Sequence, residues 1–325
     1  NMSINFRAIL NFLKFPKTQV LLLASLLFLM SAELGAQGLY IKTFGKPDAK
    51  PIIFLHGGPG YNCASFERTT AQELSQVGFY VITYDRRGEG RSAKNAEYSF
   101  DESHDDLMKI MDSLEISSAH LIGHSFGGIQ ALKFAEQFPE RVQSISLIGA
   151  PISLQASFKT ILNACEKIYT DNKDKTNLAY IKMLRDMDTS SIQYSSFCFM
   201  HAMQCGFYTC KNPNPQATKI YKSFGSDSIL MKYASKMGRQ APEGFWKNEA
   251  YTTLDLEPIL LDLKNQGISI FGIYGKEDGL YSKDQIDRLS GNIGEDNLLY
   301  LSNCSHSVFI DQQLLFIEAL ENWLK

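Results

Sequence analysis

Residues 123 to 127 read Gly-His-Ser-Phe-Gly; an apolar stretch, 119–122, leads into them and a helix-like stretch, 128–138, follows. A strand, a tight turn and a helix form the context that a Gly-x-Ser-x-Gly nucleophile elbow needs. The turn is so sharp that a Cβ on either flanking residue would clash, which explains both glycines. Ser125 would stand exposed at a sheet end and a helix N-terminus, where developing negative charge is stabilised. Such a site suits acyl transfer.

Outward from this turn, short apolar runs alternate with stretches of helical periodicity. The strand-like runs are 51–55, 79–84, 142–148, 268–274 and 297–301. The helix-like stretches are 64–77, 101–114 and 308–323. Strands that alternate with helices predict a mostly parallel central sheet covered by helices on both faces, an α/β fold.

The alternation breaks after Pro151. Residues 152–257 are polar and aromatic with mostly helical signals, and Asn-Pro-Asn-Pro at 212–215 interrupts them. The sequence therefore predicts a core made of residues 38–151 and 258–325, with residues 152–257 inserted as a helical cap.

The first 37 residues differ from the rest of the chain. Residues 2–32 hold no acidic side chain; basic residues precede an apolar run, 20–30, and small residues follow it. This order is typical of a secretory signal peptide, with cleavage after Ala36, and predicts an exported protein, periplasmic or secreted. The alternatives are an uncleaved membrane anchor over 12–34 and a structural helix. A retained segment must bury its apolar face, and pairing with a second copy would form a homodimer.

Composition narrows the function classes. The chain has 325 residues and a net charge of −3, without a basic stripe, so nothing indicates a nucleic-acid partner. Six cysteines allow 15 full pairings; Cys205 and Cys210 are the favoured pair, and buried free thiols are the alternative. No Cys/His spacing is typical of a zinc site, so we expect no metal and no cofactor.

A serine hydroxyl needs a base, normally a histidine that a carboxylate orients. Asp278 lies in the short segment 275–279 that follows the strand ending at residue 274, and His306 lies in the segment 303–307 after the last strand. The order Ser, Asp, His along the chain fits a known arrangement of this triad. We expect Ser125 as nucleophile, His306 as base and Asp278 as its orienting acid. The alternatives for the acid are Glu277, Asp255 and Glu257.

The oxyanion of acyl transfer is usually bound by two backbone N–H groups. One is expected from Phe126, which follows the nucleophile. The other is expected from Gly58, in the loop His-Gly-Gly-Pro-Gly at 56–60 that ends the first predicted strand. Further residues expected against the substrate are Gly57, Pro59, Phe245 and Trp246.

At these residues the chain resembles the α/β-hydrolase superfamily and, within it, the proline iminopeptidase branch. The loop at 56–60 is similar to that branch's oxyanion signature, and residues 85–92 are similar to its Asp-x-Arg-Gly-x-Gly-x-Ser loop. Ser125, Asp278 and His306 fall where the branch has its triad. The resemblance implies an α/β-hydrolase core and hydrolytic activity.

The chain departs from that branch in two places. The elbow of proline iminopeptidases usually reads Gly-Gly-Ser-Trp-Gly, whereas this elbow has His124 and Phe126. The branch also binds the substrate's free amine with cap glutamates beside a tryptophan, and Glu243 and Glu249 near Trp246 give no matching pattern.

Three functions follow. The sequence favours a serine hydrolase that cleaves an ester or amide bond of a small substrate through an acyl-enzyme. The first alternative is an exopeptidase that, like proline iminopeptidases, removes N-terminal residues from short peptides. The second is a ligand sensor that uses the hydrolase scaffold without turnover.

Overall fold

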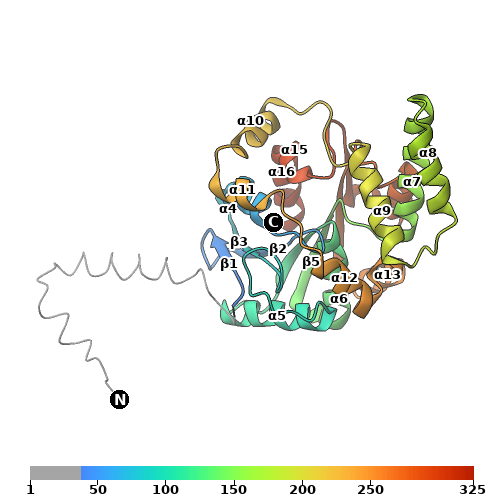
Figure 1. The fold of residues 1–325 in the computed structure, drawn as a ribbon. Coiled ribbons are helices and arrows are strands. Elements are labelled where there is room, and N and C mark those ends of the chain that lie inside the picture. The colour runs from blue at the N-terminus through green and yellow to red at the C-terminus, as the bar shows by residue number, and fades with distance from the viewer. Residues whose placement is uncertain (1–37) are drawn as a thin grey trace, which may run out of the picture.

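A computed structural model describes residues 38–325, and seven strands in it form one sheet in the order β1-β3-β2-β4-β5-β6-β7 (Figure 1). The edge strand β1 runs antiparallel to β3, and every other neighbouring pair is parallel. The α/β prediction is therefore confirmed, although no pattern in the sequence indicated β1. The strands are β1 Ile41–Phe44, β2 Lys50–Leu55, β3 Phe79–Tyr84, β4 Ala119–His124, β5 Val142–Ile148, β6 Ser269–Gly275 and β7 Leu298–Leu301.

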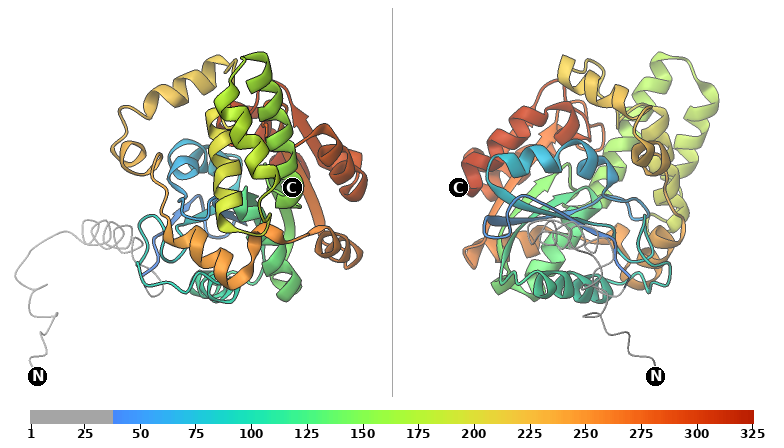
Figure 2. Two further views of the ribbon diagram at one scale, coloured as in Figure 1. Left: turned by 45° about the vertical axis from the view of Figure 1, so that its right-hand side comes forward. Right: turned by 90° about the vertical axis from the view of Figure 1, so that its left-hand side faces the viewer.

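Helices cover both faces of the sheet, which lies between them in Figure 2. Successive β2 residues alternate between the faces: Ile52 and Phe54 join one apolar cluster, Ile53 and Leu55 the other. One face carries α3 Ala64–Thr69, α4 Ala71–Gln76, α15 Val308–Asp311 and α16 Gln313–Leu324. The opposite face carries α5 Phe100–Ser113, α6 Phe126–Gln137, α13 Glu257–Asn265 and α14 Lys283–Ile293.

Six helices and one short 3-10 turn lie between β5 and α13. The chain leaves the sheet near Ile152 and comes back beside it, because Ser153 forms a bridge with Asp255 and the Leu256 N–H donates to the Ile152 carbonyl at 2.9 Å. This pairing lies at the predicted ends of the cap, 152–257. The elements are α7 Leu154–Asp171, α8 Lys175–Arg185, α9 Ile192–Gln204, α10 Pro215–Ser223, α11 Ser228–Tyr233, α12 Gln240–Glu249 and η3 Tyr251–Thr253.

Two stretches expected as single helices, 64–77 and 308–323, are each divided into two. The divisions face each other. The Thr70 hydroxyl donates to the Phe309 carbonyl at 2.8 Å, and the Gln313 amide donates to the Thr69 carbonyl at 2.6 Å. These bonds satisfy backbone groups that an unbroken helix would use, and no local periodicity reveals contacts between segments so far apart in the sequence.

The six cysteines are free thiols. The expected Cys205–Cys210 pair is absent because the two side chains lie in different surroundings: Cys205 neighbours Cys165, whereas Cys210 neighbours Glu277. The predicted signal peptide or anchor, and pairing through it, concern residues 1–37, which lie outside the described residues.

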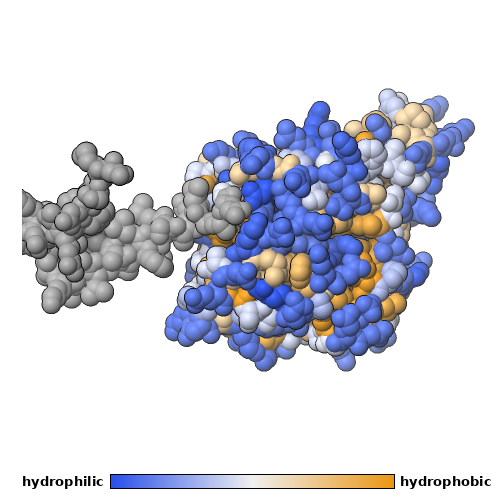
Figure 3. Space-filling model, turned by 90° about the horizontal axis from the view of Figure 1, so that it is seen from below, coloured by the Kyte–Doolittle hydropathy of each residue, from blue (hydrophilic) through white to orange (hydrophobic). Residues whose placement is uncertain are grey.

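The face of the described part that is seen from below is mainly polar. Hydrophilic side chains cover most of the face in Figure 3, with apolar residues between them. Among residues 38–325, no helix has the length and apolar character needed to cross a membrane.

The elbow glycines allow α6 to lie against the end of β2. A Cβ on Gly127 would lie 1.9 Å from the Leu55 carbonyl oxygen, and a Cβ on Gly123 would lie 2.5 Å from the Gly127 carbonyl oxygen. Both obstacles are backbone atoms, which cannot rotate away. The steric reason predicted for the two glycines is therefore confirmed.

We expect Gly127→Ala to lower the free energy of unfolding by about 1–3 kcal/mol, because overpacking here has to move the sheet or the helix. Gly291→Ala is the control: it lies in α14, and its added Cβ would meet nothing within 4 Å. That control should be neutral or stabilising by up to about 1 kcal/mol. Urea unfolding of both variants measures the difference, and equal stabilities would contradict the steric account.

Candidate active site

Ser125 occupies the turn between β4 and α6 in a strained backbone conformation, with φ 53° and ψ −122°. Its N–H donates to the Ile148 carbonyl of β5 at 3.0 Å, which fixes the turn against the next strand. The side chain is half-buried and faces a cavity above the carboxyl ends of the strands. This is the place and conformation that a nucleophile elbow requires.

Asp278 and His306 meet above the neighbouring strands β6 and β7. Asp278 Oδ2 accepts a hydrogen bond from His306 Nδ1 at 2.7 Å, and both residues are buried. The Leu280 N–H donates to the second carboxylate oxygen at 3.1 Å. An ionised carboxylate only accepts hydrogen bonds, so Nδ1 carries a proton and Nε2 is the ring nitrogen available for the role of base that the sequence predicts.

Ser125 and His306 line the same cavity, together with Gly57 and Gly58 of the loop after β2. No direct hydrogen bond joins Ser125 Oγ to the His306 ring among the described residues; such bonds are often long in unliganded sites. The structure therefore brings together the three predicted triad residues and the predicted oxyanion loop.

The loop that carries His306 is held from two sides. Asp311 Oδ2 accepts from both the backbone N–H and the hydroxyl of Ser305, at 2.8 and 2.7 Å. On the other side, His124 Nε2 donates to the His306 carbonyl at 3.0 Å. His124 thus links the nucleophile strand directly to the base. The sequence placed it beside Ser125 but could not show this contact.

His124 stays neutral because its ring is buried. Burial, helped by the nearby His306, lowers the pKa of His124 to about 3. Its ring packs edge-on against Phe309 with 5.2 Å between ring centroids. A neutral ring that donates from Nε2 has no proton on Nδ1, so its tautomer is fixed by the His306 carbonyl.

Two backbone N–H groups are free to bind an oxyanion. Phe126 is the first residue of α6, so its N–H has no acceptor within the helix. The Gly58 N–H has no acceptor among the described residues, and Gly58 has a φ of +115°, which suits glycine. Both residues line the cavity beside Ser125.

The cavity has a volume of about 490 Å³, within the usual range for small-molecule sites. Its walls come from the core and from the cap. The cap contributes Phe199 and Met203 of α9, Tyr208, and the segment after α11. The titratable side chains among the lining residues are histidines and tyrosines; Asp, Glu, Lys and Arg are absent from this wall in the described residues.

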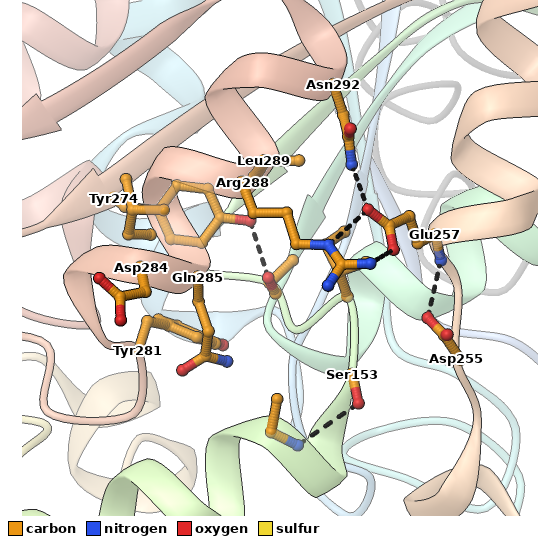
Figure 4. A pocket seen from close by; sticks show the side chains of 14 residues that line it. Ser153, Asp255, Glu257, Tyr274, Tyr281, Asp284, Gln285, Arg288, Leu289 and Asn292 are labelled. Carbon is orange, nitrogen blue, oxygen red and sulfur yellow. Dashed lines mark hydrogen bonds and ion pairs between the residues drawn. The ribbon is translucent and has the colours of Figure 1, made fainter.

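A second hollow of about 330 Å³ lies between α14 and the start of α7 (Figure 4). Several of its polar side chains are already paired: Glu257 binds Arg288 and Asn292, and Ser153 accepts from the Ala156 N–H. It contains neither the elbow nor His306. The first cavity is therefore the candidate active site.

The alternative acids lie elsewhere. Glu277 is adjacent to Asp278 in sequence, but its carboxylate accepts from the Lys211 N–H at 2.6 Å. Asp255 accepts from the Glu257 N–H at 3.1 Å, in the second hollow. Neither carboxylate hydrogen-bonds to His306.

Three of the four residues expected against the substrate do not line the cavity. Gly57 lines it, but Pro59, Phe245 and Trp246 do not. Phe245 points into the core, where its ring lies 5.0 Å from that of Phe126, and Trp246 donates to the Ser190 carbonyl at 2.7 Å. Helix α12 therefore supports the site from behind, an orientation that the cap sequence did not reveal.

The described part of the chain contains no candidate metal site. Among residues 38–325, no three His, Cys, Asp or Glu side chains are grouped as a metal-ligand set.

Comparisons with known proteins concern the fold and the family of this chain. A family model described as alpha/beta hydrolase fold matches residues 50–312. A proline iminopeptidase of Clostridium botulinum is 25% identical over 284 residues, which cover 85% of this chain and 89% of that protein. A putative carbamate hydrolase of Caulobacter vibrioides is 33% identical over 115 residues, or 34% of this chain. That match spans only 42% of the relative's length.

Solved structures show the same fold. A proline iminopeptidase-related protein of Thermus thermophilus superposes with a TM-score of 0.64 at 20% identity, over 89% of this chain and 94% of the other. An esterase of Exiguobacterium antarcticum gives 0.56 at 18% identity, over 88% and 95%. The resemblance to the proline iminopeptidase branch that the sequence indicated is confirmed by these matches.

The neutrality of His124 predicts an acid-sensitive fold. Between pH 6.5 and 3 the unfolded ring binds a proton that the folded ring does not, so the free energy of unfolding falls as the pH falls. One such group contributes up to about 1.4 kcal/mol per pH unit. Burial also lowers the pKa of His56 and His120, so the whole protein should show a larger slope.

In His124→Gln the slope between pH 6.5 and 5 should be shallower by about 1 kcal/mol per pH unit, because the amide does not titrate. Urea unfolding at several pH values measures it, with pH 8 as the reference at which the protonation difference vanishes. Identical slopes for the variant and the unaltered chain would rule out the neutral His124.

Proposed function

We propose that this chain, which belongs to the alpha/beta hydrolase family, hydrolyses carboxylic esters of small, uncharged, apolar acyl groups through an acyl-enzyme on Ser125. The observation that carries the proposal is a cavity that is lined by Ser125 and by His306, the partner of Asp278, and whose wall within residues 38–325 holds no Asp, Glu, Lys or Arg side chain.

In the proposed reaction, Ser125 Oγ attacks the ester carbonyl carbon while His306 Nε2 takes the hydroxyl proton. The bond at 2.7 Å to Asp278 supports this role, because it orients the ring and stabilises the imidazolium that forms. The Gly58 and Phe126 N–H groups bind the oxyanion of the tetrahedral intermediate.

Collapse of this intermediate breaks the bond to the alcohol, which leaves with the proton from His306. A water molecule then repeats the attack on the acyl-enzyme, with His306 again as base, and releases the carboxylic acid. The sequence of steps consumes one ester and one water, and needs no metal or redox partner.

The uncharged wall supports an ester over a peptide with a free N-terminus. An N-terminal amine is mostly protonated near neutral pH, and its burial without a carboxylate is costly. Glu243 and Glu249, the two glutamates near Trp246 that could bind such an amine, do not line the cavity. Glu249 accepts from the Phe100 N–H at 2.7 Å, and Glu243 is exposed.

The rim of the cavity also favours apolar acyl groups. Met203 and Met237 line the cavity from opposite segments of the cap, and each is 60% exposed. Flexible thioether side chains adapt to apolar ligands of different shape. An acyl chain that enters between them would cover apolar surface that is otherwise in contact with water.

A second candidate function is removal of an N-terminal residue from short peptides. The observation in its favour is the match to a proline iminopeptidase across 85% of this chain. The same nucleophile and base would serve amide hydrolysis, so the two candidates differ only in what the cavity accepts.

The test compares p-nitrophenyl butyrate with L-proline p-nitroanilide. We expect turnover of the butyrate ester, little or none of the prolyl amide, and loss of turnover by at least about 10³-fold in Ser125→Ala. A fluorophosphonate probe should label the unaltered chain and not this variant. Faster turnover of the prolyl amide would favour the second candidate, and undiminished labelling of Ser125→Ala would exclude Ser125 as nucleophile.

The two adjacent acids give a matched pair of variants. Asp278→Asn should lower kcat on the ester by about 10³- to 10⁴-fold, because the amide no longer fixes the tautomer and charge of His306. Glu277→Gln should stay within about twofold of the unaltered chain, since its carboxylate binds the Lys211 backbone N–H and neighbours the Cys210 thiol, away from His306. A larger loss in the Glu277 variant would reassign the acid.

A further inference from the structure

A buried ion pair lies directly beneath the loop at 56–60. Arg86 Nη2 donates to Glu89 Oε2 at 2.8 Å, and these residues are only 4% and 2% exposed. Neither belongs to the triad or lines the cavity. Burial of a charge costs free energy, so a buried ion pair at this place needs a physical reason.

The guanidinium of Arg86 donates two hydrogen bonds to the backbone of the loop at 56–60. Its Nη1 donates to the His56 carbonyl at 2.5 Å, and its Nη2 donates to the Gly57 carbonyl at 2.7 Å. The planar fork thus holds two successive carbonyl groups, which a lysine ammonium could not do in the same geometry.

The imidazole of His56 is a second hydrogen-bond donor to the Gly57 carbonyl. Its Nε2 accepts from the Arg86 backbone N–H at 3.1 Å, so the proton of the neutral ring lies on Nδ1. Nδ1 lies 2.9 Å from the Gly57 carbonyl oxygen and donates to it. Burial, reinforced by the charge of Arg86, lowers the pKa of His56 well below its usual value and keeps the ring neutral.

These bonds determine where the Gly58 N–H points. The Gly57–Gly58 peptide is planar and trans, so its C=O and N–H point in opposite directions. The carbonyl is held on the buried side of the loop by Arg86 and His56. The N–H is therefore directed to the other side, where Gly57 and Gly58 line the cavity beside Ser125.

We propose that Arg86, assisted by His56, is a positioning residue that orients and polarises the Gly57–Gly58 peptide, and so strengthens the Gly58 N–H as an oxyanion donor. The inference rests on the proposed function of this site. A cationic donor on the carbonyl draws electron density from the amide nitrogen and makes its N–H a better donor. The benefit grows as the oxyanion develops, so it acts on the transition state more than on the bound ester.

Glu89 completes the arrangement in two ways. It offsets the buried charge of Arg86, and its Oε1 accepts from the Gly60 N–H at 3.1 Å. The loop is therefore held at His56, Gly57 and Gly60, on both sides of the residue that donates to the oxyanion. Glu89 is thus a partner of Arg86 and not a catalytic residue.

The test uses the full chain and replaces the pair as a unit. Arg86→Met removes the donors but leaves the Glu89 carboxylate without its cationic partner. The double variant Arg86→Met/Glu89→Gln is therefore made beside it to keep the interior neutral. Removal of a whole oxyanion donor costs about 10²- to 10³-fold in kcat, so its weakening should cost about 10- to 100-fold with little change in KM. Arg87→Met is the control, since Arg87 of the same loop donates to the Asp106 carboxylate at 2.6 Å.

Two readouts separate a positioning role from a structural one. The inhibition constant of butylboronic acid, whose tetrahedral adduct places an oxygen in the oxyanion site, should rise in proportion to the loss in kcat/KM. The amide proton of Gly58, observed by NMR, should shift upfield in the double variant and not in Arg87→Met. A double variant that keeps the kcat, the boronate affinity or the Gly58 shift of the unaltered chain would overturn the proposal.

These outcomes differ from failure of the proposed function. If the unaltered chain hydrolysed no ester and bound no boronate, the proposed function would fail, whereas the Gly58 shift would still report whether Arg86 holds the peptide. An unchanged shift in the double variant would then overturn the inference by itself.

Discussion

The site depends on how closely the elbow approaches the end of β2. Gly127 lies so near the Leu55 carbonyl that a methyl group would overlap it, and Leu55 is the last residue before the oxyanion loop. This one contact sets how close the proposed nucleophile, Ser125, lies to the loop that carries the proposed oxyanion donor Gly58. The strain in the Ser125 backbone is tolerated because the neighbouring strands β2 and β5 hold the turn on both sides.

The parallel sheet then places the other parts without further adjustment. The carboxyl ends of β4, β6 and β7 lie at one edge of the sheet, so loops far apart in sequence bring Ser125, Asp278 and His306 together. His124 adds a direct bond between the first and the last of these loops. The geometry of this candidate site is thus a property of the sheet and its loops, while residues 152–257 add part of the cavity wall.

The fold, and the positions of the three candidate triad residues within it, could be predicted because both follow from local patterns. Apolar runs mark the strands, and each candidate residue lies in the segment that follows one. The contacts that the sequence did not reveal are long-range. Thr70 binds Phe309, Arg86 binds the carbonyl of Gly57, and α12 turns Phe245 inward. Between residues 152 and 257, helical periodicity indicated elements but not orientations, so Phe245 and Trp246 were expected against the substrate but do not line the cavity.

The bridge between Ser153 and Asp255 bears on which insertions and deletions the fold can accept between these two residues. Because the two ends of the insertion are joined beside the sheet, the chain between them is a closed loop whose length matters little: each doubling costs only about 0.6 kcal/mol of closure entropy. Helices can be gained, lost or exchanged within it while the strands keep their register. A lineage can therefore acquire a different substrate through its insertion and inherit the reaction unchanged from its sheet.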